Sequence, residues 1–134
     1  LCHLDVDQFK IINDTCGHAA GDELLRQIAA LLEGQLRSRD TLARLGGDAF
    51  GILMEHASLD NAVLLAEKLR STIERFQFHW RSERFSIGAS IGVVAIQPGQ
   101  SIDNTLTRAD TACYAAKNAG KNRVHAGPAL ETPA

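Results

Sequence analysis

The chain has 134 residues, a formal net charge of −2 and an isoelectric point of about 6.2. This length suits a single domain with one core, and contents of 45% hydrophobic and 22% charged residues are typical of a globular protein. The slightly acidic balance argues against a nucleic-acid-binding surface, and no run of residues is long and apolar enough to predict a membrane contact.

The first predicted strand covers residues 1–6 and carries two carboxylates near its C-terminal end, Asp5 and Asp7. Carboxylates are common at strand ends, where they can be ordinary loop residues. A turn crowded with polar side chains is predicted next, over residues 11–18, and such side chains can cap and close a loop without any ligand.

A long helix is predicted over residues 22–36, because leucine and isoleucine recur there at helical spacing and form one apolar face. Asp22 and Glu23 then fall in the first helical turn, where negative charge favours the helix dipole. The charged segment that follows, residues 37–40, is typical of a solvated loop between a helix and a strand.

Two short apolar segments, residues 42–45 and 50–54, flank a pair of glycines and predict a β-hairpin. Gly46 and Gly47 can adopt positive φ and allow a ligand to approach the bare backbone. Asp48 stands at the tip of this hairpin, where its carboxylate can face solvent or a cation.

A second long helix is predicted over residues 58–76, without side chains that suggest chemistry. A second hairpin is predicted from strands over residues 76–80 and 85–93. Gly88 and Gly92 would weaken the longer arm, so we expect another part of the backbone to pass close to it.

The last helix is predicted to begin at Ser101 and to end at Gly120, a typical residue for a helix C-terminus. Lys117 and Lys121 lie near this end, where lysines favour the helix dipole even without a ligand. A closing strand follows, and the Pro- and Ala-rich tail, residues 126–134, is predicted to be disordered or a linker.

The three cysteines, Cys2, Cys16 and Cys113, are odd in number and lack CxxC spacing. This pattern favours a reduced, cytoplasmic setting and argues against a disulfide framework or a zinc site.

The hairpin segment Arg-Leu-Gly-Gly-Asp-Ala-Phe, residues 44–50, resembles the signature of GGDEF domains, the diguanylate cyclases of bacterial signalling. Ala49 departs from it, because the family usually has Glu there. The likeness covers residues 4–123 and implies an α+β fold: a ferredoxin-like βαββαβ sandwich with an added β-hairpin, of the nucleotidyl-cyclase type. The GGDEF domain is expected over residues 1–125. The family's N-terminal DxLTGLxNR segment is missing, which predicts a fragment of a larger protein.

The resemblance also implies an active site. Residues 5–10, Asp-Val-Asp-Gln-Phe-Lys, resemble the DxDxFK element that opens it, and a ferredoxin-like sheet would bring Asp5 beside the hairpin tip. Asp5 and Asp48 would then be the catalytic carboxylates and would hold Mg²⁺ or Mn²⁺, together with the backbone carbonyl of Val6.

A nucleotide pocket is implied on the same grounds. Residues 13–22 resemble the family's guanine-binding element, in which Asn13 and Asp22 would meet the edge of the base. The phosphates would be bound by basic side chains and by the glycine turn: Lys10, Lys117, Lys121, Gly46 and Gly47. Lys121 stands where the family more often has Arg, so the charge is kept but bidentate geometry is lost.

Arg37 and Asp40 have the spacing, relative to the glycine pair, of the family's inhibitory site for cyclic di-GMP. Arg37 could form a bidentate pair with a phosphate and stack on a purine, and Asp40 could accept from a guanine edge. The alternative interpretation is the solvated loop described above.

Members of the family join two GTP molecules into cyclic di-GMP across two half-sites, so the resemblance implies a homodimer with GTP and cyclic di-GMP as ligands. Loss of a carboxylate at Ala49 would lower turnover more than binding. This predicts a weakly active or inactive domain that keeps both nucleotides as regulatory ligands.

Other functions stay open. One is an active cyclase that tolerates Ala49, and another is an active enzyme silenced by an engineered alanine. A third is a ligand-free interaction domain beside a phosphodiesterase domain. A ferredoxin-like RNA-binding domain is disfavoured by the low isoelectric point. The expected location is the cytoplasm, including the cytosolic part of a membrane-anchored multidomain protein.

Overall fold

The computed structural model describes residues 1–128 and contains one five-stranded sheet and a separate two-stranded hairpin. The strands of the sheet, in spatial order, are β2 (Thr41–Gly46), β3 (Ala49–Leu53), β1 (Cys2–Val6), β6 (Ala89–Val93) and β7 (Arg123–Ala126). The helices are α1 (Phe9–Cys16), α2 (His18–Gln35), α3 (Leu59–Glu74) and α4 (Ile102–Asn118). The separate hairpin consists of β4 (Gln77–Trp80) and β5 (Glu83–Ser86).

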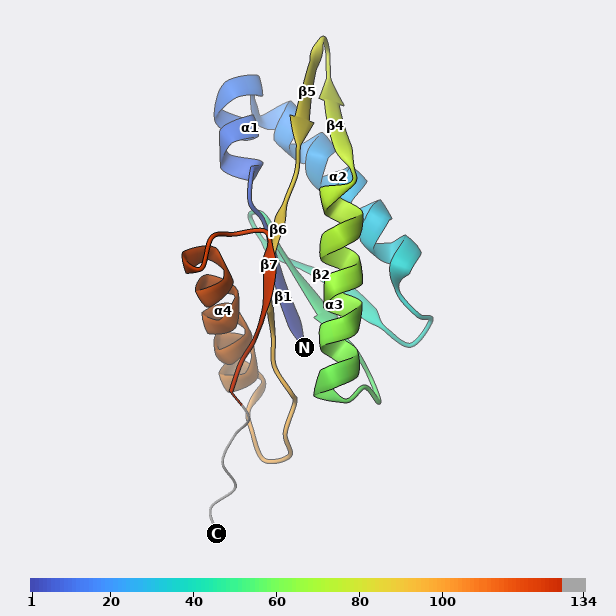
Figure 1. Cartoon of the computed structure of the whole chain (residues 1–134), viewed down its shortest axis with the longest axis vertical. Coiled ribbons are helices and arrows are strands. Elements are labelled where there is room, and N and C mark those ends of the chain that lie inside the picture. The colour runs from blue at the N-terminus through green and yellow to red at the C-terminus, as the bar shows by residue number, and fades with distance from the viewer. Residues whose placement is uncertain (129–134) are drawn as a thin grey trace.

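The order of the strands confirms the predicted ferredoxin-like core. β1 lies between β3 and β6 and is antiparallel to both, while β2 pairs with β3 at one edge. The unit α4–β7 is added to this core, and β7 runs parallel to β6. Figure 1 shows α4 on one side of the sheet and α2 and α3 on the other, so the sheet is covered on both faces.

Side-chain alternation along β1 separates the core from a polar face. Cys2, Leu4 and Val6 are buried in the main hydrophobic core, to which α2 and α3 contribute. His3 and Asp5 point the opposite way, toward α4, as expected for a strand with two-residue periodicity. The central strand therefore carries its polar side chains to the face that α4 covers.

The predicted turn over residues 11–18 is wrong, because the structure has a helix there. α1 spans Phe9–Cys16 and is amphipathic, with Ile12 fully buried against the rest of the protein. Gly17, with φ of 94°, separates it from α2, which begins at His18 rather than at residue 22. Asp22 consequently lies inside α2 and not in its first turn. Packing of α1 against α2 outweighs the turn preference of the polar residues.

The predicted long strand over residues 85–93 is divided between two sheets. β5 pairs with β4, whereas β6 pairs with β1. Backbone hydrogen bonds of Gly88 hold the segment between β5 and β6 in place. The Gly88 N–H donates to Gln8 Oε1 at 2.6 Å, and its carbonyl accepts from the Asp7 N–H at 3.0 Å. Alternation alone could not reveal this break, because the apolar pattern continues through it.

The predicted ends of the last helix are close to those of α4. Ser101 caps α4 by accepting from the Asn104 N–H at 3.0 Å, and Gly120 follows its end with φ of 127°. The predicted tail begins too early, because Ala126 belongs to β7 and the Gly127 N–H donates to the Val93 carbonyl at 2.8 Å. Residues 129–134 of that tail lie outside the described residues. No helix in the described part of the chain is long and apolar enough to cross a membrane.

Gly92 determines how closely α4 approaches the sheet. A Cβ atom there would lie 2.2 Å from the Cys113 backbone nitrogen and 2.4 Å from the Ala109 carbonyl oxygen. These are helix backbone atoms, which cannot move aside as a flexible side chain can. The close backbone neighbour predicted for Gly88 and Gly92 is therefore confirmed at Gly92, and α4 rests directly on β6.

We expect Gly92→Ala to destabilise the domain by about 1–3 kcal/mol, because the added methyl group overpacks the α4–β6 contact. Gly34→Ala is a matched control, since no atom of residues 1–128 lies within 4 Å of a Cβ in that position of α2. Alanine there should stabilise the helix by about 0.5–1 kcal/mol. Urea unfolding measures both free energies, and equal midpoints for the two variants would contradict a direct α4–β6 contact.

Candidate functional site

The C-terminal end of β1 and the tip of the β2–β3 hairpin lie side by side. Asp5 pairs across the ladder with Ala49, and the Val6 N–H donates to the Asp48 carbonyl at 3.3 Å. The charge of Asp5 also acts on Asp48: burial and this neighbouring charge raise the pKa of the Asp48 carboxyl above its ordinary value. The two carboxylates predicted to converge are therefore brought together.

The hairpin turn has the backbone conformation that its glycines suggested. Gly46 and Gly47 have φ of 124° and 51°, and a bulge lies between Arg44 and Gly46. The Arg44 guanidinium holds the turn by donating to the Gly47 carbonyl at 2.7 and 3.2 Å. Within the described residues, nothing lies within 4 Å of a Cβ at either glycine, so the turn is open on the side where a ligand could approach.

Asp5 is buried and has two partners on the α4 face. His3 Nε2 lies 3.0 Å from Asp5 Oδ1, and the Lys117 ammonium forms an ion pair with Oδ2. Burial raises the pKa of the Asp5 carboxyl, but hydrogen bonds from His3 and Lys117 and the lysine charge outweigh it, so the pKa lies below its ordinary value. Lys117, predicted to bind phosphate, therefore contacts the predicted metal ligand in this structure.

Asp7 connects three separate segments, a role that the sequence analysis missed. Its Oδ1 accepts from Ser90 Oγ at 2.6 Å, and its Oδ2 accepts from the Asn122 backbone N–H at 3.0 Å. Asn122 and its neighbour Lys121 have positive φ of 46° and 64°. Asp7 thus fixes the loop that carries Lys121, and its only signal in the sequence was its place in the DxDxFK-like element.

The two residues predicted to bind guanine come from adjacent helices. Asn13 lies on α1 against Gly21 of α2, where a Cβ would be 2.5 Å from Asn13 Oδ1. Asp22, the next residue, borders a pocket of about 280 Å³ whose other walls include Leu42, Arg44 and Phe50. Asn13 does not line this pocket, so only Asp22 faces it. Lys10 is exposed on the first turn of α1.

Arg37 and Asp40 contact each other in the loop between α2 and β2. The Arg37 side chain donates to the Asp40 carboxylate at 2.9 and 3.1 Å, and its backbone N–H donates at 2.8 Å. These hydrogen bonds hold the pKa of Asp40 below its ordinary value. Asp40 precedes β2 and Asp48 follows it, so the pair lies at the opposite end of the hairpin from the glycine turn.

A profile of the family described as diguanylate cyclase, GGDEF domain, matches residues 1–123. The chain belongs to the GGDEF family. The domain is similar to the probable diguanylate cyclase DgcE of Escherichia coli, with 42% identity over 92% of this chain. It spans only 11% of the length of DgcE.

Solved structures show the same fold for this GGDEF domain. Diguanylate cyclase SiaD of Pseudomonas aeruginosa, in complex with its activator SiaC, matches with a TM-score of 0.90 and 35% identity, over 94% of this chain and 48% of that one. The GGDEF domain of DgcB from Caulobacter crescentus, in complex with c-di-GMP, matches with a TM-score of 0.87 and 33% identity, over 93% and 75%. The predicted nucleotidyl-cyclase type of fold is confirmed.

The position of Ala49 gives its departure from the family signature a structural meaning. Residues directly opposite each other in an antiparallel ladder place their side chains on the same face. Ala49 is opposite Asp5, so a longer side chain in this position would extend over the α4 face beside Asp5 and Lys117. A carboxylate side chain at position 49 would therefore lie in the same cluster of charges.

In metal-free protein, Lys117→Met should lower the free energy of unfolding at pH 7, because Asp5 loses its ammonium partner. The folded-state pKa of Asp5 is depressed, so this stabilisation is present above its ordinary value of 3.8 and is lost as the pH falls through the lower folded value. We expect an effect on the order of 1 kcal/mol, since Lys117 is partly exposed.

Urea unfolding with a chelator at several pH values measures this effect. Lys68→Met removes the same charge from an exposed position of α3 and is the matched control. An equal loss of stability at neutral and at acidic pH would mean that Lys117 stabilises the fold by packing rather than through Asp5.

Proposed function

We propose that this GGDEF domain binds GTP with a divalent metal at Asp5 and Asp48 and makes little or no cyclic di-GMP, because Ala49 removes one carboxylate from that cluster. The observation that carries the proposal is the register that sets Ala49 opposite Asp5. The other residues that the family resemblance implies for the site are present in the sequence, so the domain would act by binding nucleotides, as a regulatory module.

The residues present fit a hard divalent cation. Two carboxylates and the Val6 carbonyl offer oxygen ligands, the type that Mg²⁺ and Mn²⁺ prefer. Burial and, after it, the charge of Asp5 raise the pKa of Asp48, and a cation between the two carboxylates would relieve their repulsion. A bound metal would neutralise charge on the nucleotide phosphates.

Lys117 would change partners when nucleotide binds. Its ammonium is paired with Asp5 in the free domain, and a metal that takes Asp5 would leave that ammonium available for a phosphate. Lys121 would approach from the loop that Asp7 fixes. Lys10 and the glycine turn complete the proposed phosphate contacts, and both are exposed enough to be reached.

Asp22 and Asn13 would supply the base specificity. Asp22 borders an open pocket, and its carboxylate could accept from the N1–H and N2–H₂ groups of guanine. Asn13 would turn from its position against Gly21 to meet the acceptor edge.

A second nucleotide site is proposed at Arg37 and Asp40, for cyclic di-GMP. The Arg37 side chain is exposed and already makes a bidentate pair with the Asp40 carboxylate, and two oxygens of a phosphate could replace that carboxylate as its partner. Synthesis would need two domains, because each carries one half-site. We therefore propose a homodimer for the full-length protein.

Calorimetry should detect GTP binding that requires Mg²⁺, and Asp5→Asn should weaken it. Asp22→Asn should reduce the preference for GTP over ATP by about 1–3 kcal/mol, because the donors of guanine lose a charged acceptor. Asp14→Asn is the matched control, since Asp14 is exposed on α1. Metal-independent binding would contradict the role of Asp5, and equal affinities for ATP and GTP in the native chain would remove Asp22 from the base pocket.

Ala49→Glu should raise the rate of cyclic di-GMP synthesis on the order of a hundredfold while leaving GTP affinity nearly unchanged, because the restored carboxylate acts mainly in the transition state. A fused coiled coil should hold two copies together in the assay, and Arg37→Ala in both proteins should prevent product inhibition. Chromatography of the products measures the rate. If the native sequence turns over as fast as Ala49→Glu, the domain is an active cyclase and Ala49 is harmless.

A further inference from the structure

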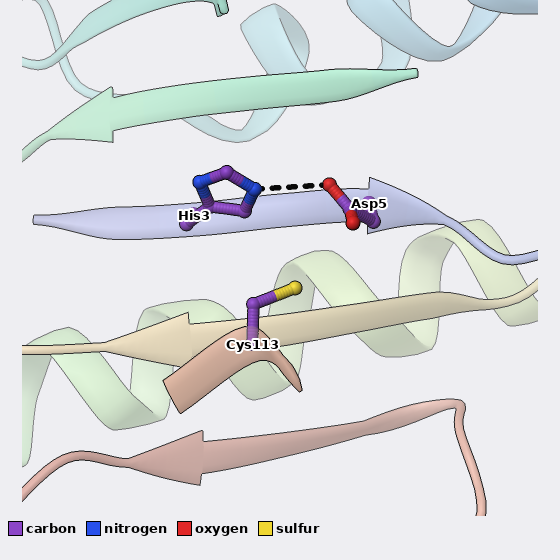
Figure 2. Close-up of side chains that lie close together, drawn as sticks. All are labelled: His3, Asp5 and Cys113. Carbon is purple, nitrogen blue, oxygen red and sulfur yellow. Dashed lines mark hydrogen bonds and ion pairs between the residues drawn. The ribbon is translucent and has the colours of Figure 1, made fainter. Parts of the chain in front are cut away.

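We propose that His3, Asp5 and Cys113 form a binding site for Zn²⁺ on the α4 face of the sheet. His3 Nε2, a carboxylate oxygen of Asp5 and Cys113 Sγ all lie within 4.8 Å of one another. Figure 2 shows His3 and Asp5 side by side on β1, with the Cys113 sulfur directed from α4 toward the same strand.

The fold holds these three side chains in place. His3 is opposite Gly92 in the β1–β6 ladder, and Asp5 is opposite Ser90. Because Gly92 has no side chain, α4 lies close enough for the Cys113 thiol to donate to the Ser90 carbonyl at 3.2 Å. The same contacts that bury Cys113 therefore place its sulfur beside the imidazole and the carboxylate.

The donor set is the one that zinc prefers. Imidazole nitrogen, thiolate sulfur and carboxylate oxygen are all zinc ligands, whereas Mg²⁺ binds oxygen and has little affinity for thiolate. In a tetrahedral site with these bond lengths, ligand atoms lie roughly 3.5 Å apart. Closing the cluster around an ion thus requires a small movement of side chains. The fourth position could be filled by a water molecule or by Asp110, whose Oδ1 lies 3.5 Å from His3 Nε2.

Binding would require Cys113 to lose its proton. Burial raises the pKa of the Cys113 thiol to about 12, so the free domain holds it as a thiol, and zinc would displace its proton to solvent. His3 would coordinate as neutral imidazole. The Lys117 ammonium is paired with Asp5 Oδ2. It therefore leaves the other oxygen, Oδ1, which faces His3, available to the zinc ion.

Sharing of Asp5 gives the site a regulatory consequence, which rests on the proposed function. Asp5 would be a ligand in both sites, of zinc beside Cys113 and of magnesium beside Asp48. Binding both ions at once would bring two divalent charges close together, which is unfavourable. Zinc at this site should therefore weaken Mg²⁺-dependent GTP binding.

The direct test uses the 134-residue chain, a phosphine reductant and no nucleotide. Zn²⁺ affinity is measured by competition with a chromophoric chelator, and Co²⁺ reports thiolate ligation through its charge-transfer absorption. We expect one ion per chain, a loss of affinity of at least about tenfold in Cys113→Ser and in His3→Gln, and no charge-transfer band in Cys113→Ser. Cys16→Ser, a thiol on α1 outside the cluster, should bind like the native chain.

Circular dichroism shows whether each variant folds, and His3→Gln keeps the test decisive if Cys113→Ser does not. A charge-transfer band that survives in Cys113→Ser, or native affinity in a folded His3→Gln, would overturn the site. A band that disappears only in Cys16→Ser would assign the metal to another thiol and would overturn it as well.

A second experiment separates this site from the proposed function. Mg²⁺-dependent GTP binding is measured with and without Zn²⁺ in the native chain and in Cys113→Ser. We expect zinc to weaken GTP binding only in the native chain. Zinc binding with unchanged GTP affinity would overturn the competition, whereas a failure of GTP to bind at all would overturn the proposed function and leave the zinc measurement standing.

Discussion

The two antiparallel ladders of β1 are the constraint on which both the core and the site depend. One ladder, with β3, sets Asp5 opposite Ala49, and the other, with β6, sets His3 opposite Gly92. Side chains alternate along the strand, so the same register buries Leu4 in the core and turns Asp5 toward α4. A slip by one residue would exchange the two faces, which is why the core and the site are specified together.

Asp5 and Asp48 are neighbours whose pKa values are shifted in opposite directions. Hydrogen bonds from His3 and Lys117 lower the pKa of Asp5 below its ordinary value, whereas burial and the charge of Asp5 raise that of Asp48. A cation that binds between them would stabilise Asp48 but would have to compete with Lys117 for Asp5. The metal binding proposed at this site would therefore be an exchange of cationic partners, and its strength would depend on which partner the lysine ammonium finds instead.

Local sequence patterns were sufficient for much of the fold. The hairpin at Gly46 and Gly47, the cap at Ser101 and the helix end at Gly120 all depend on residues within a few positions of one another. The pairing of Asp5 with the hairpin tip came from the family resemblance. The helix at residues 9–16 was missed because packing against α2, the next helix in the chain, outweighs the turn preference of its polar residues. The break at Gly88 was missed because it depends on a distant partner, Gln8, which binds the Gly88 amide 80 positions away.

The sequence by itself determined the family, the glycine turn, the two carboxylates and the absence of a glutamate at residue 49, because each of these is a property of residue identity and short-range spacing. Tertiary structure alone decided what surrounds them. The cysteines lacked zinc-binding spacing, yet Gly92 lets α4 settle on β6 and brings Cys113 to His3 and Asp5. The tertiary structure likewise pairs Lys117 with Asp5. Such a long-range contact depends on how helices pack on the sheet, which no local spacing encodes.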